Sequence, residues 1–419
     1  MFQGLEMRKF FLILCAFVLV HPVWALDVDY RLGLGAGWIM PDGKVDLMVG
    51  QKGQWYGPVV GADFSATFYP EWNAMQQWNG AGWGVGLAYW NLSDSLLGHA
   101  FAPYTYMDIP LVKLPHFRMG LRPGIGAALM TKTYPNTVPD SQLFQSLEGA
   151  NRSIGSALNL YFPEMLYLDF PLAGGWSLGV TGGWYHISNG SVRQPNSGYN
   201  IFAGELSLRY RPAHRECMCD LSLSPSEPTT YLSANRWHIA VAATGGSRQV
   251  YYRDQQSFLV GSAHVAAYWL LHPIFRLGVG VDAFYDAAYK PRDTHFQKTN
   301  LAAADPGGAD CWRVGVSLQP EFVVGDFTAG LHVGAYMYDP VKNLEPYHEA
   351  KESETGRLDK PVFYRYDLWK AGSAGYMDGW MYTELVLRYH LPWNVFVQAM
   401  MKSHLTKVEF ISLGLGFYY

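Results

Sequence analysis

The sequence predicts an all-β protein, a transmembrane antiparallel β-barrel of about sixteen strands, and three observations favour this fold class. The chain of 419 residues has only 16% charged residues, 16% aromatic residues and 44 glycines, which is too apolar for a typical soluble enzyme. Beyond the N-terminus, no apolar stretch reaches the length of about 18 residues that a membrane-spanning helix needs. Short segments in which apolar residues alternate with small or polar ones recur along the chain, as barrel strands require.

The N-terminus is typical of a cleaved signal peptide. Arg8 and Lys9 give it a positive charge, and the apolar run that follows, residues 10–20, is too short to span a bilayer. Val23 and Ala25 stand at the −3 and −1 positions of a cleavage site, so we predict cleavage after Ala25. Export followed by insertion of barrel strands predicts an outer-membrane location.

Period-two alternation defines the expected strands. In the last one, every second residue from Ile411 to Tyr419 is apolar or aromatic, and serine and glycine lie between them. An even number of strands is what closed bacterial barrels prefer. The expected strands are Tyr30–Met40, Val59–Tyr69, Gly82–Trp90, Ala102–Val112, Phe117–Met130, Ser156–Phe170, Trp176–Ser188, Asn200–Tyr210, Trp237–Gly245, Leu259–Leu271, Phe275–Tyr285, Cys311–Val323, Phe327–Tyr338, Trp380–His390, Asn394–His404 and Lys407–Tyr419.

The connections between these strands alternate in length, as short periplasmic turns and long outer loops do. The exception is a Pro- and Ser-rich linker that divides the chain into halves of about eight strands. We expect one larger closed barrel rather than two eight-stranded barrels, because closure removes every strand edge; the sequence leaves both open. The expected organisation is a signal peptide (1–25), a first half that carries the candidate site (26–211), the linker (212–233) and a second half that completes the barrel (234–419).

A dense group of polar residues surrounds the end of the seventh expected strand. Alternation places His186 and Ser188 on the bulky apolar face, and therefore on the lipid side. Unpaired polar groups in hydrocarbon cost free energy, so we expect the two side chains to bond as general base and nucleophile. Asn200 lies on the apolar face of the next strand, where its amide oxygen can orient the histidine. Glu205 falls on the opposite face, and we assign it to the lumen.

Two short motifs stand close together here. His-x-Ser-Asn occupies His186–Asn189, and Pro-Asn-x-Gly occupies Pro195–Gly198 directly before a strand. In these motifs the chain resembles the lipid A 3-O-deacylase (PagL) and acyloxyacyl hydrolase family of outer-membrane esterases. The resemblance covers roughly residues 26–211 and implies an eight-stranded barrel whose site faces lipid near the outer surface. It implies His186 and Ser188 as the catalytic pair, with Asn189 and Gly190 as oxyanion contributors.

The chain departs from the family pattern at two positions. Asn200 stands where the family has an acid, and Ser191 stands where it has a glycine after the asparagine. An amide can hold the histidine tautomer but stabilises an imidazolium less than a carboxylate does. The departure therefore bears on the rate of catalysis, and the second half of the chain is an extension beyond the PagL barrel.

The function predicted from these residues is removal of an ester-linked acyl chain from lipid A or a related envelope lipid, by Ser188, His186 and Asn200. A catalytic pair on the outside of a barrel suits a substrate that diffuses in the membrane. Lipid A and outer-membrane lipid are therefore the expected partners, and the oligomeric state is left open. The net charge of −4 gives no basic surface for nucleic acid.

No metal or organic cofactor is expected for this reaction. Cys217-x-Cys219 with His214 is an incomplete ligand set, and we interpret it as a turn with incidental thiols. The alternative function is a non-catalytic outer-membrane barrel, that is, a pore, a transporter or a structural protein. About sixteen strands in one barrel would leave an aqueous lumen, which favours that alternative.

Overall fold

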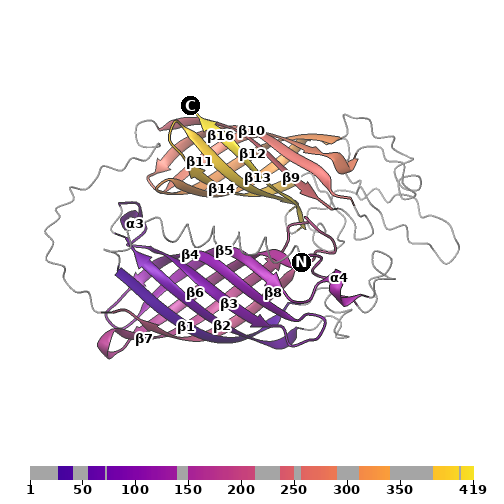
Figure 1. Cartoon of the computed structure of the whole chain (residues 1–419). Helices are drawn as coiled ribbons and strands as arrows, with labels where there is room; N and C mark the ends of the chain where they lie inside the picture. Colours follow the sequence, from indigo (N-terminus) through magenta and orange to yellow (C-terminus); the bar gives the residue numbers. More distant parts are fainter. Residues whose placement is uncertain are drawn as a thin grey trace.

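Sixteen β-strands make up most of the regular structure that the computed structural model describes (Figure 1). It describes residues 27–40, 55–70, 73–138, 150–212, 236–249, 256–289, 311–339, 381–404 and 407–419. The predicted signal peptide, most of the predicted linker 212–233, and His214, Cys217 and Cys219 lie outside these residues. All sixteen strands expected from the alternation are present, with their ends shifted by a few residues at most.

The first eight strands close into one antiparallel barrel, because β1 pairs with β8 from Tyr30 through Ile39. Its strands are β1 (Asp27–Ile39), β2 (Tyr56–Tyr69), β3 (Gly82–Asn91), β4 (His99–Lys113), β5 (Arg118–Met130), β6 (Leu158–Pro171), β7 (Trp176–Ser188) and β8 (Tyr199–Tyr210). Two short helices, α3 (Asn73–Gln77) and α4 (Tyr134–Thr137), lie in its connections. Within the described part of the chain, no helix is long and apolar enough to cross a membrane.

The last eight strands close into a second barrel, in which β16 pairs with β9. Its strands are β9 (Trp237–Arg248), β10 (Phe258–His272), β11 (Phe275–Asp286), β12 (Trp312–Val324), β13 (Phe327–Tyr338), β14 (Met381–His390), β15 (Val395–His404) and β16 (Lys407–Tyr418). The structure thus closes each half separately, in place of the single larger barrel that we expected. Closure within each half satisfies the free edges of its own first and last strands, so neither half needs the other for pairing.

The two faces of the strands differ in chemistry as a membrane barrel requires. Leucine, valine and aromatic side chains cover the outside, for example Leu34, Leu206 and Leu259, which are each more than 60% exposed. The lumens hold buried ion pairs, such as Arg31 with Asp63 in the first barrel. Eight strands enclose an interior that side chains fill. The aqueous lumen that favoured a pore depended on sixteen strands in one barrel, which the structure does not have.

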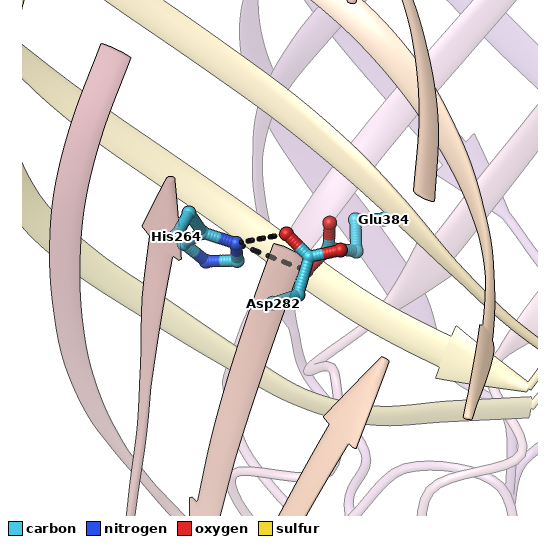
Figure 2. Close-up of side chains that lie close together, drawn as sticks. All are labelled: His264, Asp282 and Glu384. Atoms are coloured by element: carbon cyan, nitrogen blue, oxygen red, sulfur yellow. Dashed lines mark hydrogen bonds and ion pairs between the residues drawn. The ribbon is translucent and has the colours of Figure 1, made fainter. Parts of the chain in front are cut away.

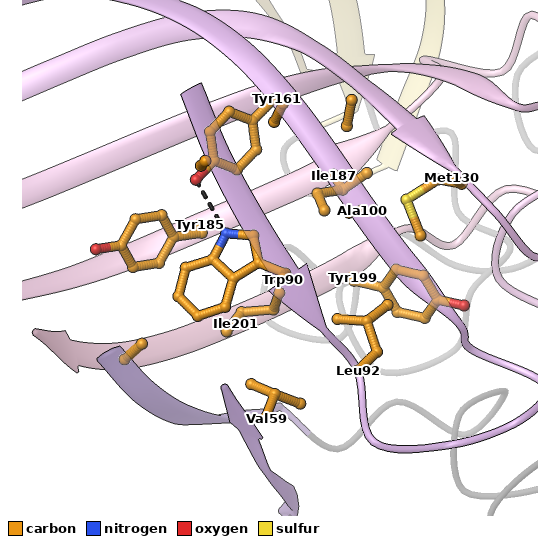
Figure 3. Packing of buried hydrophobic residues seen from close by; sticks show 14 of the residues in the cluster. Val59, Trp90, Leu92, Ala100, Met130, Tyr161, Tyr185, Ile187, Tyr199 and Ile201 are labelled. Carbon is orange, nitrogen blue, oxygen red and sulfur yellow. Dashed lines mark hydrogen bonds between the residues drawn. The ribbon is translucent and has the colours of Figure 1, made fainter. Parts of the chain in front are cut away.

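A buried cluster fills the lumen of the first barrel near the β7–β8 connection (Figure 3). Trp90 lies within it and donates a hydrogen bond from Nε1 to Tyr161 Oη at 3.1 Å. β7 and β8 contribute Tyr185, Ile187, Tyr199 and Ile201, all at most 1% exposed. Because successive strand residues point to opposite faces, anchoring these four inward turns the residues between them outward. The cluster therefore fixes the backbone on which the candidate site stands.

Candidate active site

The end of β7 and the start of β8 bring three predicted site residues together. His186 and Asn200 are direct partners in the β7–β8 register, and Ser188 follows two residues along β7. His186 Nε2 lies 3.0 Å from Ser188 Oγ, and His186 Nδ1 lies 2.8 Å from Asn200 Oδ1. The imidazole is thus bonded on both sides, to a hydroxyl and to an amide oxygen.

Trp184 defines which way this chain of hydrogen bonds runs. Its indole Nε1 donates to Asn200 Oδ1 at 3.2 Å. An indole N–H can only donate, so the Asn200 atom that faces it is the oxygen, which can only accept. His186 Nδ1 must therefore carry the proton that it shares with this oxygen. That tautomer leaves the lone pair of Nε2 directed at Ser188 Oγ, as a general base requires.

Aromatic rings flank the histidine on the outer face of the barrel. The ring centroids of Trp184 and Phe162 lie 5.5 Å and 6.2 Å from that of His186. Ser188 is 3% exposed, so its hydroxyl is shielded from solvent. Shielding from water strengthens the electrostatic interactions within such a site.

Asn189 follows the serine and holds the loop that leads to β8. Its Nδ2 donates to Ser156 Oγ and to the Arg193 carbonyl oxygen, both at 2.8 Å. Its backbone N–H donates to Asn196 Oδ1 at 3.0 Å. The structure therefore uses Asn189, which we expected at the oxyanion, to brace the loop. This last hydrogen bond explains the asparagine of the Pro-Asn-x-Gly motif, because Asn196 holds the backbone of the residue that follows Ser188.

Two glycines of this loop have a left-handed backbone that favours glycine. Gly198 has φ +73°, and an added Cβ would lie 2.6 Å from the Ile187 carbonyl oxygen and 3.0 Å from Ser188 Cβ. Gly190 has φ +59°, and an added Cβ would collide with the Ile411 side chain on β16. Both positions need glycine. At Gly198 the loop lies close to Ser188, and at Gly190 the second barrel lies close to the loop.

The second barrel also forms hydrogen bonds with this loop. Ser191 Oγ donates to the Val408 carbonyl oxygen at 2.8 Å, and Gln249 N donates to the Ser191 carbonyl oxygen at 2.9 Å. Gln194 N donates to Gln249 Oε1 at 2.8 Å. The loop between Ser188 and Asn200 is thus held by both barrels. Ser191, which replaces the family's glycine, is one of the residues that make this connection.

Glu205 lies in the lumen, on the face that the alternation assigned to it. Its carboxylate accepts from Arg31 Nη1 at 3.0 Å and from Tyr185 Oη at 3.1 Å. It does not contact His186. The residue that sequence reasoning missed is Trp184, whose indole donates to Asn200 Oδ1. Its place two residues before His186, on the same face, was the available signal.

Two family models match the chain. Residues 60–209 match the lipid A 3-O-deacylase (PagL) model, and residues 235–350 match the model of the acyloxyacyl hydrolase C-terminal domain. No curated protein matches the chain.

Solved structures of outer-membrane proteins resemble parts of it. The outer membrane enzyme PagL is 19% identical over 42% of this chain and 97% of its own, with a TM-score of 0.26. Neisserial surface protein A is 9% identical over 44% of this chain and 96% of its own, with a TM-score of 0.27. Ail of Yersinia pestis is 11% identical over 44% of this chain and 98% of its own, with a TM-score of 0.24.

The fold and the site define the class as an outer-membrane β-barrel with a hydrogen-bonded Ser–His pair on the outward face of a strand in its wall. The two family models match in order along the chain, one in each half, and relate the two halves to the lipid A 3-O-deacylase (PagL) and acyloxyacyl hydrolase families. The family matches support an outer-membrane enzyme that hydrolyses esters of lipid A.

Proposed function

We propose that this protein is a serine esterase that removes an ester-linked acyl chain from lipid A, with Ser188 as nucleophile, His186 as general base and Asn200 as the residue that orients His186. The observation that carries the proposal is the pair of contacts made by the His186 ring, 3.0 Å to Ser188 Oγ and 2.8 Å to Asn200 Oδ1. A nucleophile bonded to a base that a third group orients is the arrangement that activates serine.

In the first half of the reaction, Ser188 Oγ attacks the acyl carbonyl carbon while His186 Nε2 takes the hydroxyl proton. The tetrahedral oxyanion then collapses and breaks the ester C–O bond. The proton on Nε2 passes to the leaving oxygen, which stays on lipid A as a hydroxyl. In the second half, water attacks the acyl-serine with His186 again as base, and the fatty acid is released.

Asn200 keeps Nδ1 protonated throughout the cycle, because its oxygen accepts from that nitrogen and from Trp184 Nε1. It supplies orientation without the negative charge that a carboxylate would place beside the imidazolium. We assign the oxyanion to the backbone N–H of Gly190 and to the Asn189 side chain. For the latter, Nδ2 must exchange one of its two loop hydrogen bonds for the oxyanion.

Mass spectrometry of lipid A tests the proposal. Cells that lack other lipid A deacylases would express the wild type or Ser188→Ala, with folding of both barrels verified by heat-dependent gel mobility. We expect loss of one acyl chain from lipid A in the wild type only. Identical lipid A in both strains, with both proteins folded in the membrane, would contradict the proposed function.

A further inference from the structure

We propose that the lumen of the second barrel binds a divalent transition-metal ion, such as zinc, through His264, Asp282 and Glu384 (Figure 2). These residues come from β10, β11 and β14, and they are 4%, 0% and 0% exposed. One ligand atom from each lies within 4.8 Å of the others. One imidazole nitrogen and two carboxylate oxygens are a ligand set that zinc accepts, with a fourth position left for water.

The remaining polar atoms of the three ligands are held by other side chains. His264 Nε2 lies 2.6 Å from Ser262 Oγ, and Tyr382 Oη donates to Asp282 Oδ2 at 2.6 Å. His332 Nδ1 lies 3.3 Å from Glu384 Oε2. Metal ligands in proteins are oriented by outer partners of this kind. The atoms left to face one another are His264 Nδ1, Asp282 Oδ1 and Glu384 Oε1.

Glu384 Oε1 gives the second, independent indication of a ligand. It is buried and has no hydrogen-bond partner among the described residues, and it lies 3.9 Å from His264 Nδ1. A buried carboxylate oxygen without a partner is costly. A cation between it and His264 would satisfy it.

The charges in this lumen also favour a cation. Glu321 pairs with Arg276 and Arg388. Among the described residues, by contrast, Asp282 and Glu384 form ion pairs only with histidines. Neither of these two buried carboxylates pairs with a guanidinium or ammonium group among the described residues, so a divalent cation between them would compensate their charge.

The same side chains have the spacing of a hydrolytic triad, since His264 Nδ1 lies 2.8 Å from Asp282 Oδ1. Ser262, however, is 6% exposed in the lumen, and its Oγ contacts Thr244 Oγ1 at 2.6 Å and Met400 Sδ at 3.8 Å. An acyl ester in the bilayer lies on the other side of the barrel wall. In the metal site, Ser262 instead accepts the Nε2 proton and leaves Nδ1 for the ion.

Metal binding by the full-length chain in detergent tests the site. Cys217→Ser/Cys219→Ser is the background, because those thiols could take zinc themselves. After chelation, the chain is dialysed against zinc and its metal content is counted by mass spectrometry. We expect one bound zinc per chain, and binding weaker by about tenfold or more in Glu384→Gln and His264→Gln. His404→Gln alters a different histidine–carboxylate pair of the lumen, with Glu409, and should bind as the background does.

No zinc in the background chain, or equal zinc affinity in Glu384→Gln, would overturn the proposal. If the substituted chains do not fold, the absorption spectrum of cobalt(II) bound to the background chain decides. Bands of a four- or five-coordinate ion with nitrogen and oxygen ligands support the site, and the spectrum of the hydrated ion alone refutes it. Neither readout depends on deacylase activity, so this test is independent of the proposed function.

Discussion

The two barrels use nearly the same local arrangement on opposite faces of their walls. In each, a histidine and a serine lie two residues apart on one strand, and the histidine's direct partner in the register of the neighbouring strand is a polar residue. In each, Nε2 bonds the serine and Nδ1 bonds that partner. The sets are Ser188, His186 and Asn200 in the first barrel, and Ser262, His264 and Asp282 in the second.

The difference is the direction in which the side chains point. The first set lies on the outward face of its barrel wall, and the second faces a filled lumen beside another carboxylate. The second set even has the acid that the first lacks. Distances between residues of the right kinds therefore do not identify a catalytic site in a barrel. The strand face decides which molecules can reach it.

The largest expected effect separates the two serines. Ser188→Ala should lower the rate of deacylation by about a thousandfold or more, because the attacking atom is lost. Ser262→Ala removes a hydroxyl that faces the lumen and should leave that rate within about twofold of the wild type. Acyl release from lipid A by the purified proteins in detergent measures both. An equal loss of deacylation rate in both variants would mean that the strand face does not separate a catalytic serine from a structural one.

The next effect asks whether the barrels are separate units. Arg31→Met leaves Asp63 and Glu205 without their cation and should destabilise the first barrel by about 3 kcal/mol. Arg276→Met should act likewise on the second barrel, where it leaves Glu321 with Arg388. Hydrogen–deuterium exchange during urea unfolding, followed in peptides from each barrel, measures both changes. A common shift of all sixteen strands in either variant would argue against independent barrels.

The missing acid can be restored. Asn200→Asp should raise the rate of deacylation by about tenfold, because a carboxylate stabilises the imidazolium as well as orienting it. Asn200→Ala should lower the rate by about tenfold, since the tautomer is no longer held. Single-turnover measurements compare the variants. A fall in rate with both substitutions would mean that the amide itself is needed, for example because of its place beside Trp184.

A smaller effect concerns the close approach of the loop to the site. Gly198→Ala places a methyl group against Ile187 O in a left-handed backbone, which costs about 1 kcal/mol of strain. We expect the rate of deacylation to fall by about fivefold as a result. Gly182→Ala is the matched control, because nothing lies within 4 Å of its added Cβ on the lipid face of β7. Deacylation by both variants tests the pair, and similar losses would show that the barrel wall in general tolerates no added methyl.

The smallest effect tests the influence of the second barrel on the first. Gly190→Ala should slow deacylation because its methyl meets Ile411, and Ile411→Ala should restore part of the loss by making room. We expect a coupling of about 0.5–1 kcal/mol in this double-mutant cycle. If the effects of Gly190→Ala and Ile411→Ala on the rate are additive, the contact between β16 and the loop does not influence catalysis.

Period-two alternation by itself determined much of this protein. Because the side-chain period of a strand is two, it predicted all sixteen strands and the outward face of His186, Ser188 and Asn200. It also placed Glu205 inside. These are local properties, since each depends only on which neighbours along the chain are apolar.

Closure and partner choice were decided only by the tertiary structure. β1 and β8 meet through a long-range register that no local pattern records, and so the sequence did not reveal two barrels. His264, Asp282 and Glu384 gather from three strands because the second barrel closes around them. The contact of Trp184 with Asn200, and the close approach of Gly190 to Ile411, also depend on the tertiary structure. A strand's own sequence selects a face, but its partner across the wall or across the lumen depends on how the whole sheet is curved and joined.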